Sequence, residues 1–308
     1  MKSKKILLSG LFAASAFLFS ADKRNLTTAE KLERDPIAYL MSDEYKAQIF
    51  DELIHGSIPD DALAQPDIST STAGEVDLEK SGFALMMDIQ LAMYEDSVNA
   101  GLVFNHHGQR YKVKAADLID MEENQKRFLK EIKSDLEPSV IITPDLPYKV
   151  SCMDDGHGYL QIEIDPSSFV YFNKKGLLGA SAHEVAHTED EPFPKAPISR
   201  DDSLKITRKN EIRADKRAAG LTSPAHMEAA LYQVATSLQD DARAMPASGA
   251  AMMIDNKDRF GFTVTPAKIH PSAGRRIQYL KMLELYQQGK IAREPQFPPE
   301  QDFMPRLK

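Results

Sequence analysis

Hydrophobic positions recur with helical spacing in several segments of the first half of the chain. Residues 42–56 begin with a serine, carry an apolar stripe and end with a glycine, which predicts a helix. The segments 82–101 and 115–136 have the same spacing and predict two further helices. Residues 57–80 contain "DISTSTAGE" and no aromatic side chain, which predicts a linker. We therefore expect residues 22–138 to form a helical N-terminal region.

Past Pro138 the pattern changes. Three short runs, "SVIIT", "YKVSC" and "YLQIEI", are separated by Pro, Asp and Gly residues and predict strands. Helical spacing then continues to Gln288, and the Pro-rich tail 289–308 predicts no regular structure. The predicted fold class is α+β, with a mostly helical domain over residues 139–288 that contains a small β-sheet.

The N-terminus has the pattern of an export signal. Lys2, Lys4 and Lys5 precede an uncharged apolar run from Ile6 to Ala21. This run is shorter than the roughly 20 residues that a membrane-spanning helix needs. We expect a signal peptide over residues 1–21 and a periplasmic or secreted protein. The alternative is an uncleaved anchor, which would be the only membrane contact of the chain.

Composition narrows the classes of function. The formal net charge of −8 over 308 residues argues against a nucleic-acid-binding protein, because such proteins normally present a basic surface. The only cysteine, Cys152, excludes an intramolecular disulfide, so an exported domain has to depend on its core and on any metal that it binds. We interpret Cys152 as a small buried side chain, with a zinc ligand of a latent state as the alternative.

Candidate chemistry is concentrated in "HEVAH", residues 183–187. A helix through residues 177–188 would place His183 and His187 on one face, with Cβ atoms about 5–6 Å apart. Two imidazoles at this spacing can bind one Zn²⁺. Glu184 follows the first ligand and can reach a metal-bound water without replacing it, as a general base for hydrolysis must. Short motifs also arise by chance, so the flanking sequence has to supply the rest of the site.

A catalytic zinc needs a third protein ligand. The pattern HExxHxxGxxH is excluded, because Asp190 and Phe193 occupy its glycine and last histidine positions. Downstream, "NEIRADKRAAG" places Glu211 and Asp215 four residues apart on a predicted helix, 24 residues after His187 (211 − 187). Glu211 is the predicted third ligand, and Asp215 is the predicted hydrogen-bond acceptor of a ligand histidine. The alternative is a solvated helix face with charges at i and i+4.

Three motifs in order, "HEVAH", "EIRAD" and "HPSAGRRIQYL", resemble the HExxH, ExxAD and HPxxxxR motifs of metallopeptidase family 48. This is the gluzincin group that contains the CAAX prenyl protease, and the resemblance covers about residues 139–288. It implies a zincin-like catalytic domain with one zinc per chain, bound by the two histidines and the later glutamate, and with Glu184 as the base. It also implies that His270 and Arg276 lie beside the metal and bind the substrate or stabilise the oxyanion. In the family a longer, often membrane-embedded insertion usually separates the first two motifs.

The resulting hypothesis is an exported zinc metalloendopeptidase that hydrolyses peptide bonds of protein or peptide substrates. One alternative is a non-proteolytic zinc-binding chaperone or envelope-assembly factor, and another is a zinc hydrolase restricted to short peptides. Residues 22–80 could also block the cleft as a pro-region that is cut within the linker. The acidic residues 189–191 are interpreted as part of a solvated loop, or as a cleft rim that disfavours acidic substrates.

Overall fold

The computed structural model describes residues 26–56, 58–67, 75–77, 101–144, 146, 149–192, 194, 198–244 and 271–298. The predicted signal peptide, much of the predicted linker and all but the last residue of the helix expected over 82–101 lie outside the described residues. The described part of the chain contains no helix that is long and apolar enough to cross a membrane.

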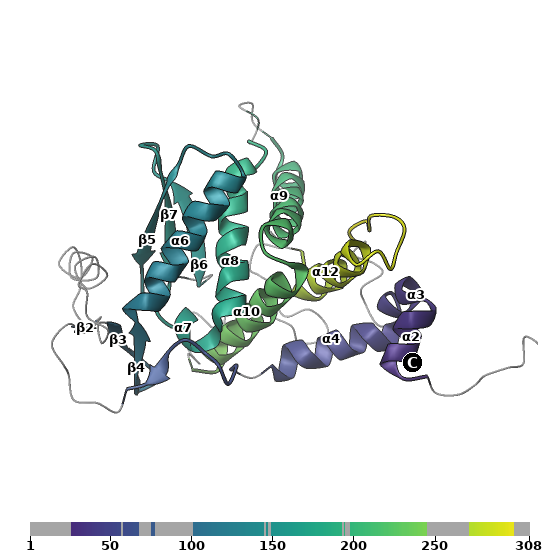
Figure 1. The fold of residues 1–308 in the computed structure, drawn as a ribbon, viewed down its shortest axis with the longest axis horizontal. Coiled ribbons are helices and arrows are strands. Elements are labelled where there is room, and N and C mark those ends of the chain that lie inside the picture. Colours follow the sequence, from purple (N-terminus) through teal and green to yellow (C-terminus); the bar gives the residue numbers. More distant parts are fainter. Residues whose placement is uncertain are drawn as a thin grey trace, which may run out of the picture.

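The described fold is α+β, as predicted (Figure 1). Its helices are α2 Thr28–Arg34, α3 Pro36–Leu40, α4 Asp43–His55, α6 Ala115–Glu131, α7 Ser168–Tyr171, α8 Lys174–Ala186, η1 His187–Glu189, α9 Arg200–Leu221, α10 Pro224–Ala244 and α12 Ala273–Gln287. Its strands are β1 Gln65–Pro66, β2 Glu75–Asp77, β3 Gly101–His106, β4 Gln109–Lys114, β5 Glu137–Ile142, β6 Val150–Asp154 and β7 Tyr159–Ile164.

Several predicted elements are confirmed. Helix α4 begins after Ser42, whose hydroxyl accepts a hydrogen bond from the Tyr45 amide at 3.2 Å, and Gly56 is its C-cap residue. Helix α6 starts at the first residue of the stretch predicted over 115–136, and β7 coincides with "YLQIEI". The caps of α4, the helical spacing of α6 and the alternation of β7 therefore identified these elements correctly.

The predicted small sheet has the strand order β5-β7-β6. Strand β5 pairs with β7 in parallel, and β6 pairs with β7 in antiparallel orientation. Helix α8 lies between this sheet and the helices α9, α10 and α12 (Figure 1). Because it has packed neighbours on both sides, α8 is nearly continuous core from Leu177 to Ala186.

The N-terminal region is not wholly helical, which corrects the prediction. Strands β3 and β4 form an antiparallel hairpin, and the sheet β1-β4-β3-β2 is built around it. The hairpin turns at His107 and Gly108, which have φ values of 50° and 78°. Both values lie in the left-handed region, as expected for a tight two-residue hairpin turn.

Helices from the N-terminal region share the core of the rest of the chain. On α4 the side chains of Tyr45, Ile49 and Leu53 are buried and belong to the same hydrophobic cluster as residues of α10 and α12. At the edge of this contact the Tyr232 hydroxyl donates a 2.6 Å hydrogen bond to Glu52. The core is therefore continuous across the domain boundary predicted at residue 138.

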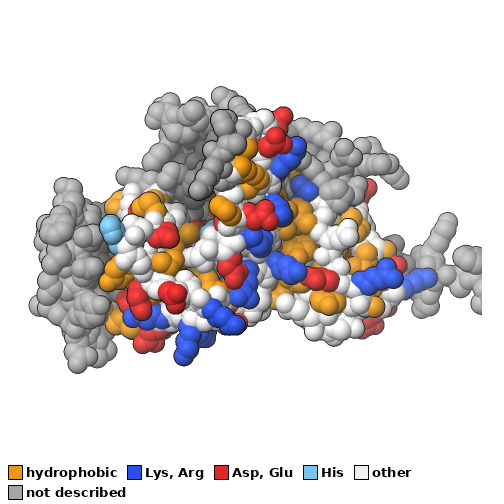
Figure 2. Space-filling model, turned by 90° about the horizontal axis from the view of Figure 1, so that it is seen from above, with side chains coloured by type: hydrophobic (Ala, Val, Ile, Leu, Met, Phe, Trp, Pro, Cys, Tyr) orange, Lys and Arg blue, Asp and Glu red, His pale blue; other side chains and the backbone are white. Residues whose placement is uncertain are grey.

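Charged side chains are mixed on the surface. On the face seen in Figure 2, the described Lys and Arg side chains are interleaved with Asp and Glu side chains. Hydrophobic side chains lie between them. The described surface on this face is therefore of mixed charge.

Candidate metal centre

Helix α8 carries the HEVAH residues at its C-terminal end. The helix begins after Asn173, whose side chain accepts a 2.9 Å hydrogen bond from the Gly176 amide. It ends at Ala186, so His187 is its C-cap residue and the first residue of η1. The helix predicted over 177–188 thus ends slightly early, and the two histidines differ in setting: His183 is buried in the last turn, and His187 is half-buried just beyond it.

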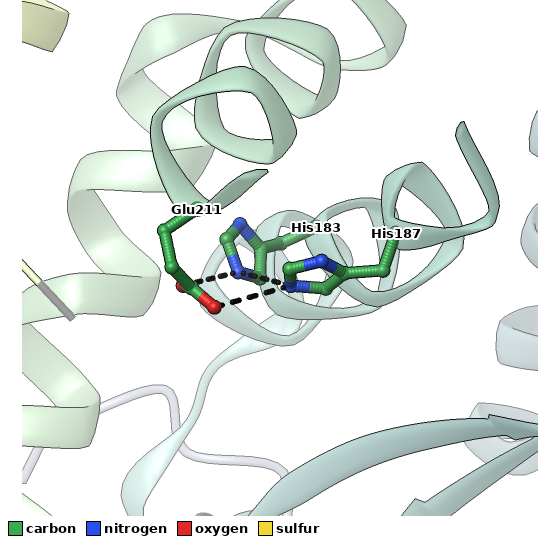
Figure 3. Close-up of side chains that lie close together, drawn as sticks. All are labelled: His183, His187 and Glu211. Carbon is green, nitrogen blue, oxygen red and sulfur yellow. Dashed lines mark hydrogen bonds and ion pairs between the residues drawn. The ribbon is translucent and has the colours of Figure 1, made fainter. Parts of the chain in front are cut away.

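The three predicted metal ligands converge on one point (Figure 3). The Nε2 atoms of His183 and His187 lie 3.1 Å apart. The carboxylate of Glu211, from the middle of α9, places Oε2 3.3 Å from Nε2 of His183 and Oε1 3.6 Å from Nε2 of His187. One possible ligand atom from each side chain lies within 4.8 Å of the others, so this group could hold a metal ion.

Asp215 lies behind His183, as the sequence predicts. Its Oδ1 atom is 3.0 Å from Nδ1 of His183, on the ring edge opposite the shared point. A carboxylate at Nδ1 favours a proton on that nitrogen, which leaves the Nε2 lone pair directed at the other ligands. Asp215 is 0% exposed, so this contact is fully shielded from water.

Arg276 binds Asp215 from helix α12. Its Nε atom donates to Oδ2 at 2.7 Å and its Nη2 atom donates to Oδ1 at 2.5 Å, a bidentate pair. Its Nη1 atom lies 3.9 Å from Oε2 of Glu211. The arginine of the HPxxxxR motif therefore does lie beside the candidate centre. Its guanidinium is paired with the Asp215 carboxylate, which lies behind His183. His270, the histidine of the same motif, lies outside the described residues.

The charges around His183 favour a positive charge at this position. Burial alone would lower the pKa of His183, but hydrogen bonding to Asp215 and Glu211 outweighs it and raises the pKa to about 10. Burial would also raise the pKa of Asp215, but the Arg276 guanidinium and His183 outweigh it and lower that pKa. A site that stabilises an imidazolium in this way also suits a cation bound by the same imidazole and carboxylate.

Asp190 is a member of the site that the sequence did not identify. Nδ1 of His187 hydrogen-bonds Oδ2 of Asp190 at 2.8 Å, and Nη2 of Arg213 donates to Oδ1 of Asp190 at 3.3 Å. The sequence indicated position 190 as a mismatch to the three-histidine pattern and as part of an acidic loop or cleft rim, but not as a partner of His187. The available signal was an acidic residue three positions after the second histidine, at the end of the helix.

Glu184 and Cys152 lie next to each other. Glu184 is half-buried on α8, and its backbone carbonyl accepts a 3.1 Å hydrogen bond from the Cys152 thiol of β6. Burial, with the Glu184 side chain as the next cause, raises the pKa of Cys152 far above its ordinary value. The thiol is therefore protonated, and Cys152 contributes no atom to the His183, His187 and Glu211 group.

Comparison of the chain with protein-family models, with curated proteins and with solved structures yields no match. The likeness to metallopeptidase family 48 therefore rests on the three sequence motifs. What the structure adds is the convergence of His183, His187 and Glu211 into a group that could hold a metal ion.

Proposed function

We propose that this protein is an exported zinc-dependent metalloendopeptidase. The observation that carries the proposal is the convergence of the two Nε2 atoms, 3.1 Å apart, on the Glu211 carboxylate, whose Oε2 lies 3.3 Å from His183 and whose Oε1 lies 3.6 Å from His187. Ligand atoms 2.0–2.1 Å from a tetrahedral zinc lie about 3.3 Å from one another, and these contacts are close to that spacing. Three protein ligands of the His₂Glu type are typical of catalytic zinc sites, which keep one position open.

Zinc bound here would supply Lewis acidity to the scissile carbonyl and to a water molecule. The proposed general base is Glu184, which adjoins His183 in α8. Its carboxylate would take up the proton of the attacking water and return it to the leaving amine. Asp215 and Arg276 hold the His183 ring in orientation and compensate each other's buried charge.

Strand β6 supports a peptide as substrate, because it is an edge strand of its sheet in the described structure. The Asp165 amide donates to the Lys149 carbonyl and the Asp155 amide donates to the Tyr159 carbonyl, so backbone groups of odd-numbered residues face β7. The backbone N–H and C=O groups of Cys152 therefore point to the open edge. An extended peptide paired with this edge would pass beside Glu184, which the Cys152 thiol contacts.

The test is zinc content by elemental analysis, combined with casein hydrolysis. Wild type is expected to contain one zinc per chain and to hydrolyse casein. Glu211→Ala should lose zinc and activity together, whereas Glu184→Gln should keep zinc and lose activity. The control is Glu122→Gln, the same change on helix α6 at a residue paired with Lys126, and it should affect neither property.

Each alternative outcome has a separate meaning. A wild-type protein that contains no zinc would refute the metal site. Full zinc occupancy without Glu211 would place the third ligand elsewhere. Zinc binding without hydrolysis of casein or short peptides would favour the alternative of a non-proteolytic envelope chaperone or assembly factor.

A further inference from the structure

The acidic residues that follow HEVAH are all paired with bases of helix α9. The contacts are Glu189 Oε2 to Arg217 Nε at 3.0 Å, Asp190 Oδ1 to Arg213 Nη2 at 3.3 Å, and Glu191 Oε1 to Lys209 Nζ at 2.6 Å. We call these three pairs the acid–base ladder. Its bases are spaced by four residues and form one stripe along α9, on a different side of the helix from Glu211 and Asp215.

A buried amide fixes the same segment to α9. The Asn210 side chain accepts from the Glu191 amide and donates to the Glu191 carbonyl, both at 3.2 Å, and Asn210 is buried. Exposed ion pairs contribute little singly, but together with this two-way backbone clamp they fix where the chain leaves His187. Since Asn210 precedes Glu211, the clamp and the ligand belong to the same turn of α9. This contact therefore joins the segment after His187 to the turn of α9 that carries Glu211.

The middle pair of the ladder differs from the other two, because it reaches a metal ligand. Asp190 uses Oδ1 for Arg213 and Oδ2 for Nδ1 of His187. Glu189 and Glu191 have the same charge and pair with the same helix, but in the described part of the chain no hydrogen bond or ion pair joins their carboxylates to either histidine. Asp190 can therefore orient His187, whereas Glu189 and Glu191 can only join the segment to α9.

Each of the two proposed ligand histidines is thus held by an aspartate that pairs with an arginine, and the two aspartate–arginine pairs differ in burial. Each Nδ1 faces an aspartate whose other contacts include an arginine: Asp215 and Arg276 for His183, Asp190 and Arg213 for His187. The Asp215 side chain is 0% exposed, whereas those of Asp190 and Arg213 are 30% and 34% exposed. The His187 side of the site is therefore open to solvent and salt.

We infer that Asp190 is a positioning residue that sets the orientation of His187 as a metal ligand, and that its ion pair with Arg213 holds the Asp190 carboxylate in place. The inference rests on the metal site of the proposed function. Hydrogen-bond partners of ligand histidines typically contribute 10–100-fold to metal affinity. Because the pair with Arg213 is half-exposed, added salt weakens this support, while the buried pair behind His183 is screened much less.

The test measures zinc affinity by competition with a chromophoric chelator, and the visible absorption spectrum of the Co²⁺-substituted protein. Asp190→Ala is expected to weaken zinc binding about 10–100-fold and to change the Co²⁺ spectrum. Asp190→Asn should weaken it less, because its side-chain carbonyl can still accept from Nδ1 of His187. The matched controls Glu189→Gln and Glu191→Gln each remove one outer pair and should stay within about twofold of wild type.

Thermal unfolding with chelator checks that each variant is folded, which we expect because Asp190 lies at the surface end of η1. Asp190→Ala that binds zinc as tightly as wild type, with an unchanged Co²⁺ spectrum, would overturn the inference. Equal losses of zinc affinity in Asp190→Ala and Glu189→Gln would also overturn it. The acid–base ladder would then only join the segment after His187 to α9, with no separate role for Asp190. A wild-type protein that binds no zinc would instead refute the proposed metal site itself.

Discussion

Replacing Arg276 by methionine tests whether this arginine supports the site through Asp215 or acts on the substrate. Methionine keeps an unbranched apolar stem but has no charge and no donor. The variant would leave the fully buried Asp215 carboxylate without its bidentate partner, which now donates to it at 2.7 and 2.5 Å. We therefore expect a large loss of stability rather than a change confined to catalysis.

The magnitude follows from the burial of both charges. Removing one partner of a buried, hydrogen-bonded ion pair typically costs about 3–5 kcal/mol, because the remaining charge stays buried and uncompensated. Arg276→Met is expected to fall in this range. The double variant Asp215→Asn, Arg276→Met should lose less than the sum of the two single variants, since neither buried charge remains.

Urea unfolding in the presence of chelator measures this loss without a contribution from bound metal. Arg275→Met is the matched control: Arg275 is the preceding residue of α12, lies over the Phe297 ring and donates from Nε to the Pro298 carbonyl at 2.9 Å. Its loss should cost about 1 kcal/mol. If Arg276→Met unfolds like wild type while hydrolysis is lost, the pairing argument fails and the substrate role implied by family 48 gains support.

Two further predictions concern the helices that hold α8 and α4. A Cβ atom on Gly179 would lie 2.3 Å from the His226 carbonyl oxygen of α10, so Gly179→Ala should lower the free energy of unfolding by about 1–3 kcal/mol. Gly220→Ala, which meets open space on α9, should leave it unchanged or raise it by up to about 1 kcal/mol, and urea unfolding compares the two. Burial, opposed by Lys281, raises the pKa of Glu228 from 4.5 to about 7, so the folded state disfavours its ionised form. Wild type should therefore lose stability as pH rises from 4.5 to 7, by up to about 3 kcal/mol relative to Glu228→Gln, and a difference that does not vary with pH would contradict this.

The elements that the sequence predicted correctly are those with local signals. Ser42 and Gly56 mark the ends of α4, and the alternation of "YLQIEI" marks β7. The hairpin of β3 and β4 was missed because Gly101 closes an apolar run with helical spacing, and because its turn uses His107 before Gly108 rather than the Asn or Asp that usually indicates a tight turn.

In the candidate centre, too, the features with local sequence signals could be predicted and those that depend on distant partners could not. The convergence of His183, His187 and Glu211 could be predicted because each HExxH or ExxAD spacing is a property of one helix, and only one contact, between α8 and α9, had to be supplied by the fold. The acid–base ladder could not be predicted in this way. A basic stripe at Lys209, Arg213 and Arg217 looks the same whether it faces water or an acidic segment, and its partners are 18 to 28 residues away.

The arrangement of His183, His187 and Glu211 depends on more of the chain than the motifs cover. Helix α8 is seated against α10 at Gly179, α12 supplies Arg276 to the Asp215 behind His183, and η1 is fixed to α9 beside His187. A change in any of these contacts would move an imidazole without altering a ligand. Because ligand affinity depends on such outer contacts as well as on the donor atoms, the same three motifs in a chain that lacked Asp190 or Arg213 would predict a weaker metal site.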